Sequence, residues 1–251
     1  MPVLNRHVCC ILPVMALLWG CSTDVPANWF ALNAEVKVLH EQGRYGEALD
    51  VARQALEVAQ EQYGPEHRLT ASALNNLALL YKLQEHYEEA ERCYQEAMAI
   101  MADSLGEVHP AMATLANNLA AVYREQEQYT DAEPLFETAL AIYESHYGED
   151  DPNVGIALMN LARVYMHTGR LEKAEQLLQR GQAIFEDTFL PNHPYLAAIL
   201  HSKGELRMVQ GHHSDALALY KDALRIREHV HAPNHPEVLA SRAAIEALEN
   251  E

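Results

Sequence analysis

The sequence is poor in basic residues. Its 251 residues include 18 Lys and Arg against 36 Asp and Glu, which gives a formal net charge of −18 with His neutral. A surface of this charge repels phosphate backbones and anionic lipid head groups, so we do not expect nucleic acid as a partner. We interpret the acidity as a solvated surface that keeps the chain soluble.

Cysteine is also scarce, with four residues in the whole chain. Cys9 and Cys10 lie in an apolar N-terminal run, Cys21 lies at its end, and Cys93 stands alone. If the run is removed and Cys21 is acylated, one thiol remains, so a disulfide framework is not expected in the mature chain. We interpret Cys93 as an ordinary helix residue.

Strand signals and catalytic motifs are missing as well. The sequence contains no alternating runs of β-branched residues, which are typical of strands. It also contains no glycine-rich phosphate loop, nucleophile elbow or metal-binding His pair with a base. The sequence therefore predicts an all-α protein that is not an enzyme and uses no cofactor or small-molecule substrate.

The longest apolar run, residues 8–19, has twelve residues. This is too short to span a bilayer and is typical of the apolar region of a signal peptide. Leu18-Trp19-Gly20-Cys21 follows and resembles a bacterial lipobox, with Trp19 as a departure. The resemblance implies a lipoprotein signal peptide over residues 1–20, lipidation of Cys21 and a tether over 21–28. Plain secretory cleavage, giving a secreted or periplasmic protein, and an uncleaved or cytosolic start are the alternatives.

A period of 42 residues dominates the rest of the chain. It separates the members of three sets: Asn76, Asn118 and Asn160; Tyr81, Tyr123 and Tyr165; and Ala48, Ala90, Ala132, Ala174 and Ala216. A fixed period in this range indicates stacked supersecondary units.

Each unit has the pattern of two helices. Residues 74–81 and 90–101 both place apolar side chains on one face of a helix of 3.6 residues per turn. The break between them is so short that it predicts an antiparallel pair. Thr130 with Glu133 predicts a capping box for a second helix, with Pro134 in its first turn.

The ends of the units are marked by glycine and proline. Glycines at positions 64, 106 and 148 predict left-handed closing residues, and prolines at 110, 152, 194 and 236 predict first-turn residues of the next unit.

The segments 74–81, 87–91 and 132–136 carry a family resemblance: they resemble the 42-residue tetratricopeptide repeat (TPR) of kinesin light chains. The resemblance implies a right-handed α-solenoid of about five antiparallel helix pairs with a C-terminal capping helix. The solenoid would occupy residues 29–251, with repeats at about 29–62, 71–104, 113–146, 155–188 and 197–230 and the cap at 236–250. In a solenoid we expect each unit to contact only its neighbours.

The resemblance also places candidate binding residues on the concave side. Asn76, Asn118 and Asn160 face the groove in the repeats that this chain resembles, and an amide can grip the backbone of an extended peptide. Lys82, Arg124 and Arg163 lie nearby and could pair with carboxylates of an acidic peptide or a C-terminus. The alternatives are that the amides bond a neighbouring helix and that Lys82 and Arg124 are solvated helix-end charges, whereas Arg163 falls in the middle of its helix.

Histidine recurs at one loop position before proline, as His109, His193 and His235; His67 shares the position without a proline and Asp151 replaces histidine in one unit. We interpret this recurrence as a structural loop feature and predict no metal site.

The sequence thus predicts a protein-interaction scaffold that binds an extended peptide segment of a partner. The lipobox and Ser22 after it resemble those of outer-membrane lipoproteins facing the periplasm, which suggests envelope assembly or secretion. A structural homo-oligomer and a regulatory subunit without a peptide ligand are the alternatives.

Overall fold

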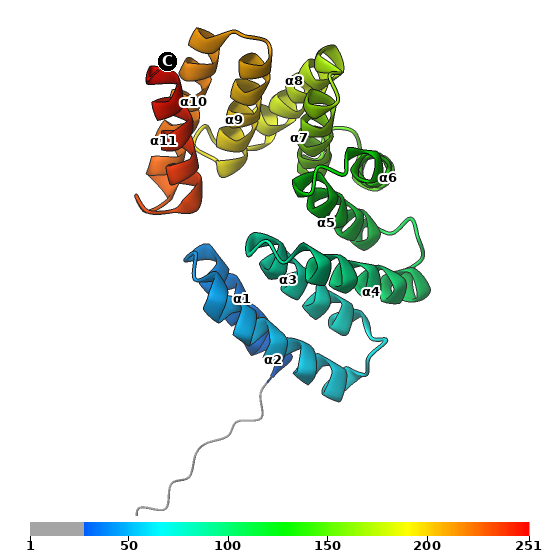
Figure 1. The fold of residues 1–251 in the computed structure, drawn as a ribbon. Helices are drawn as coiled ribbons and strands as arrows, with labels where there is room; N and C mark the ends of the chain where they lie inside the picture. Colours follow the sequence, from blue (N-terminus) through cyan, green and yellow to red (C-terminus); the bar gives the residue numbers. More distant parts are fainter. Residues whose placement is uncertain (1–27, 251) are drawn as a thin grey trace, which may run out of the picture.

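The structure, a computed structural model, describes residues 28–250 and contains eleven α-helices and no strand in that range, which confirms the all-α prediction (Figure 1). The predicted signal peptide, Cys21 and the tether up to residue 27 lie outside the described residues. The helices are α1 (Trp29–Glu41), α2 (Tyr45–Tyr63), α3 (Arg68–Leu83), α4 (Tyr87–Leu105), α5 (Pro110–Glu125), α6 (Tyr129–Tyr147), α7 (Pro152–His167), α8 (Leu171–Thr188), α9 (Pro194–Val209), α10 (His213–Val230) and α11 (Pro236–Glu249). Between residues 28 and 250, no helix combines the length and the apolar character needed to cross a lipid bilayer.

The helices pack as consecutive pairs, from α1 with α2 to α9 with α10, and α11 packs on α10 without a second helix of its own. Each pair also packs on the next one, and α3, α5, α7 and α9 contact one another in sequence. The pairs therefore form an arc in which these odd-numbered helices lie on the inner side (Figure 1). This is the expected α-solenoid with a C-terminal capping helix.

Alanine is required where the two helices of a pair cross. The alanines of the 42-residue register are completely buried at Ala48, Ala90, Ala132, Ala174 and Ala216. A side chain as small as a methyl group lets the helix axes approach closely. Large residues elsewhere in the unit can then fill the interior. Tyr94, Phe136 and Phe185 do so and are fully buried.

The recurring loop histidines cap the first helix of each later unit. The Nδ1 atoms of His67, His109, His193 and His235 accept a hydrogen bond from the backbone N–H two residues ahead, at 3.1, 3.1, 3.2 and 3.4 Å. Asp151 does the same through Oδ1 at 2.8 Å. Each cap satisfies a backbone donor that has no partner inside the helix. The four prolines stand at the first helical position, as predicted.

Two predictions of local structure are wrong. Helix α6 begins at Tyr129, so Thr130 and Glu133 form no capping box, and Pro134 lies inside the helix. Glu133 pairs with Arg170 instead. The glycines at 64, 106 and 148 have positive φ, as expected, but their ψ values of 158°, 160° and 166° are extended rather than left-handed helical.

The arc curves so far that its two ends meet. A Cβ atom on Gly43, in the turn after α1, would lie 4.0 Å from Cδ of Pro236 at the start of α11. A cavity of about 620 Å³ lies at this junction and is lined from both ends of the chain, by His40 and Tyr45 on one side and His231 and Glu237 on the other. The first and last units therefore lie close to each other across this cavity, because the rotation from unit to unit accumulates along the arc, whereas the main helix-to-helix packing is between neighbouring units.

Candidate peptide-binding groove

Asparagine side chains on the inner helices bond one another from unit to unit, and we call this series the amide ladder. Nδ2 of Asn118 donates to Oδ1 of Asn75 at 3.0 Å, and Nδ2 of Asn160 donates to Oδ1 of Asn117 at 3.0 Å. Asn76 donates to Asn33 in the same way. Each amide therefore bonds the neighbouring inner helix, which is the alternative that the sequence left open. A contact between these amides and a peptide stays a prediction.

The three predicted cations lie on successive inner helices. Lys82 and Arg124 occupy the same position of adjacent units, at the ends of α3 and α5, and Arg163 lies on α7. Nη1 of Arg124 donates to Oδ1 of Asn160 at 3.1 Å, and its Nη2 donates to Oε1 of Glu125 at 2.6 Å. Arg124 thus joins the amide ladder to the charged part of the groove.

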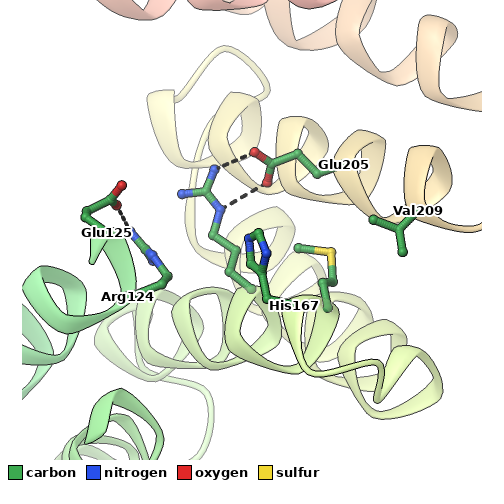
Figure 2. A pocket seen from close by; sticks show the side chains of 7 residues that line it. Arg124, Glu125, His167, Glu205 and Val209 are labelled. Carbon is green, nitrogen blue, oxygen red and sulfur yellow. Dashed lines mark hydrogen bonds and ion pairs between the residues drawn. The ribbon is translucent and has the colours of Figure 1, made fainter. Parts of the chain in front are cut away.

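Arg163 is held by Glu205 across two units. Nε and Nη2 of Arg163 each donate to one carboxylate oxygen of Glu205 at 3.1 Å (Figure 2). The two residues are one period apart and lie on α7 and α9. A bidentate pair fixes the plane of the guanidinium and leaves Nη1 available for a third group.

These side chains surround a pocket of about 280 Å³ on the inner face. Figure 2 shows Arg124 with Glu125 on one side and Glu205 on the other. The complete lining is Arg124, Glu125, Arg163, Met166, His167, Glu205 and Val209. The pocket therefore combines ion pairs with a small apolar surface, which suits a polar segment carrying one apolar side chain.

Burial and repulsion perturb the cations of the groove. Burial, with the nearby Arg124 and Arg163, lowers the pKa of Lys82 to about 8, although Glu125 opposes this shift. Burial also lowers the pKa of Arg124, and Arg163 adds to that effect. Glu125 is partly buried, which raises its pKa, but Arg124 draws that pKa below its usual value.

The charges of the groove do not balance. Within the described residues, the ammonium of Lys82 makes no ion pair or hydrogen bond, whereas Arg124 and Arg163 have Glu125 and Glu205 as carboxylate partners. The cluster therefore has one cation more than it has carboxylates, inside a chain of net charge −18. A partly buried cation without a partner favours an incoming anion.

Sequence reasoning placed Glu205 beside the groove but did not predict that carboxylates pair with these cations, and it missed a second buried network. Arg227 is almost fully buried and donates through Nη1 to Oγ of Ser241 at 2.6 Å. The 42-residue spacing of Arg163 and Glu205 could have indicated their pair, because equivalent positions on adjacent inner helices face each other. Cys93 behaves as predicted: burial raises the pKa of its thiol to about 11, so it stays protonated at neutral pH.

Comparison with known proteins agrees with this architecture. The family model for the tetratricopeptide repeat matches residues 31–103, 111–187 and 154–229. The chain therefore belongs to the tetratricopeptide-repeat family, whose fold is that of a protein-interaction scaffold. Among curated proteins, no sequence matches this chain.

Several solved structures have the same fold. BtubC (BKLC) from P. vanneervenii is 24% identical, with a TM-score of 0.63 over 81% of this chain and 82% of that chain. A kinesin light chain protein of Podosopora anserina with nearly identical TPR-like repeats is 22% identical, with a TM-score of 0.60 over 81% and 97%. Aspartyl phosphate phosphatase F from Bacillus subtilis is 18% identical, with a TM-score of 0.60 over 90% and 62%. At these identities the likeness shows the fold alone.

Proposed function

We propose that this protein is a non-enzymatic scaffold that binds an extended, acidic segment of a partner protein in its concave groove. The observation that carries the proposal is the cluster of Lys82, Arg124 and Arg163, in which three cations face the two carboxylates of Glu125 and Glu205 within a strongly acidic chain. A carboxylate of the partner would pair with Lys82, whose ammonium makes no ion pair with any residue between 28 and 250.

The geometry of the inner face supports an extended segment rather than a folded surface as the ligand. The ladder of amides, Arg124 and the pocket follow one another along the inner helices from α3 to α9. A strand-like ligand could follow this line and meet a new polar group at each unit. The carboxylates of Glu125 and Glu205 keep Arg124 and Arg163 oriented, so little side-chain freedom is lost when the ligand binds.

We also propose that the scaffold is attached to the bacterial envelope through a lipid on Cys21. The support is the sequence Leu18-Trp19-Gly20-Cys21 after an apolar run of signal-peptide length. With Ser22 next to the cysteine, the expected location is the periplasmic side of the outer membrane, in an assembly or secretion complex. A Cys21→Ser variant should leave the membrane fraction, and the mass of the mature N-terminus should lose the acyl groups.

The binding role is tested by recovery of partners from detergent-solubilised envelopes with the full chain as bait. A variant with both Lys82→Gln and Arg124→Gln should lose the partner while its helical circular dichroism is retained. The matched control is Arg92→Gln, which removes a cation from an exposed position of α4. Equal recovery with all three baits would contradict the groove proposal.

A further inference from the structure

The junction between the two ends of the arc contains a cluster of metal-binding side chains. One nitrogen each of His231 and His235 and one carboxylate oxygen of Glu237 lie within 4.8 Å of one another. Nε2 of His231 is 3.6 Å from Oε2 of Glu237. His40 of α1 lines the same cavity from the opposite end of the chain.

The repeat register shows that these residues are departures from the rest of the solenoid. Positions equivalent to His231 hold Tyr63, Leu105, Tyr147 and Phe189, and positions equivalent to Glu237 hold Leu69, Ala111, Asn153 and Tyr195. Positions equivalent to His40 hold Lys82, Arg124, Met166 and Met208. Nitrogen and oxygen ligands thus replace other residue types at three register positions, and the fold brings all three to one cavity.

The structural role of the loop histidines accounts for only part of the cluster. His235 caps α11 through Nδ1, as the equivalent histidines cap other helices, and its ring stacks on His231 with centroids 4.0 Å apart. Phe189 stacks on His193 in the same way at 3.8 Å. A phenyl ring would therefore serve the stacking role, and neither capping nor stacking explains an imidazole at 231. Glu237 has a separate partner, because its Oε2 lies 3.5 Å from Nε of the buried Arg227.

We propose that His231, His235 and Glu237 bind a divalent transition-metal ion of the Zn²⁺ type at the junction of the two ends. Two imidazoles and one carboxylate form a ligand set that Zn²⁺ accepts, with a further position open in the cavity. This inference is independent of peptide binding, because the cluster lies outside the pocket formed by Arg124 and Arg163.

Binding requires small local adjustments that the structure can make. The ligand atoms must contract until each lies about 2.0–2.2 Å from the ion. Binding through Nε2 of His235 places a proton on Nδ1, so this residue gives up its cap; at 3.4 Å that bond is the longest of the five caps. Arg227, whose Nε lies 3.5 Å from Oε2 of Glu237, remains behind the carboxylate and orients it.

The test is calorimetric titration of the purified, chelator-stripped full chain with Zn²⁺, with Mg²⁺ as the comparison ion. We expect one Zn²⁺ per chain, no comparable binding of Mg²⁺, and a rise in melting temperature with Zn²⁺. His235→Asn should weaken Zn²⁺ binding by more than about tenfold. Asparagine is a good N-cap residue, so this variant removes the ligand and keeps the helix start.

Two variants complete the test. His231→Phe restores an aromatic ring of the type found at Phe189 and should lower Zn²⁺ affinity by a similar factor. His193→Asn makes the same change as His235→Asn one unit earlier, where no second ligand is present, and should leave Zn²⁺ affinity unchanged. Absence of Zn²⁺ binding in the parent chain, or equal affinity of the parent, His235→Asn and His231→Phe, would overturn the proposal.

Discussion

The middle of the solenoid, α3 to α8, is regular, whereas its ends are not. In the middle, amides bridge successive inner helices at each unit, as with Asn118 and Asn160. At the same register, the first unit has Ala34 and the fifth has Ser202. The amide bridge still reaches the first unit, through Asn76 and Asn33, but the fifth unit lacks it. The ends also lie close to each other, with Gly43 near Pro236. Regular positions thus maintain the stacking of units, and departures from the register mark specialised surfaces.

The difference between the middle and the ends is tested most strongly with a matched pair of glycines. A Cβ atom on Gly155, in the middle, would lie 2.5 Å from Cε1 of Phe185, whose ring is fully buried and cannot move away. Gly155→Ala should destabilise the fold by about 1–3 kcal/mol. Gly46, in the first unit, has nothing within 4 Å of such an atom, so Gly46→Ala should stabilise it by about 0.4–1 kcal/mol. Denaturant unfolding of both variants measures the difference, and equal signs would contradict this account.

The second prediction concerns Lys82 in the groove. Its pKa in the folded chain is about 8, below the usual 10.5, so the folded state is penalised while the unfolded chain holds the proton. The penalty is complete below pH 8 and disappears above pH 10.5. Lys82→Met should therefore stabilise the fold at pH 7 by about 1–2 kcal/mol, after allowance for partial exposure. Thermal unfolding at several pH values between 7 and 10 should show the gain shrinking as the pH rises.

The same lysine connects stability with binding. The Lys82→Met variant should be more stable but bind an acidic ligand less well, because the charge that costs stability is the one that the ligand pairs with. A constant gain at all pH values would indicate that packing of the methionine, and not the charge, is responsible.

The third prediction compares one register position in two units. Asn118→Ala removes a bridge to Asn75 and should cost about 0.5–1.5 kcal/mol. Ser202 occupies the equivalent position in the fifth unit, where its Oγ is buried without a hydrogen-bond partner in the described part of the chain. Ser202→Ala should therefore be neutral or stabilising. A loss of similar size at both positions in chemical denaturation would show that the amide bridge contributes little.

The smallest effect is expected when the protein concentration is varied and the oligomeric state is measured. Glu246 is exposed on α11, at the register position where Ala120 and Ala162 are buried. A carboxylate there disfavours stacking of a second copy on the C-terminal face. Sedimentation of the purified chain should therefore give a monomer at all concentrations. A molecular mass that rises with protein concentration would support the homo-oligomer alternative.

The features that were predictable from the sequence are those that repeat. The fold, the buried alanines and the first-turn prolines follow from a single period, because the same local constraint acts in each unit. The start of α6 was missed because Thr130 and Glu133 match a capping box by composition, whereas the helix begins one residue earlier at Tyr129. Capping by histidine was missed because the pattern gives the position but not the atom that accepts the bond.

Contacts between units were harder to predict than the units themselves. The pairing of Arg163 with Glu205 requires that α7 and α9 pack side by side in the same axial register, which the period suggests but does not prove. The meeting of the first and last units depends on the small rotation between neighbours, summed over the whole arc, and no short segment of sequence encodes that sum. The histidine and glutamate cluster at the junction has the same origin.

Gly43 lies close to Pro236, which has a consequence for how this chain can change in length. An open superhelix tolerates gain or loss of one hairpin, since the packing between the remaining hairpins is unchanged. Here the first hairpin lies beside the last helix, so a change in the number of hairpins would alter that arrangement. Duplication or deletion of 42 residues in the middle would preserve every local interaction and still pull the two termini apart.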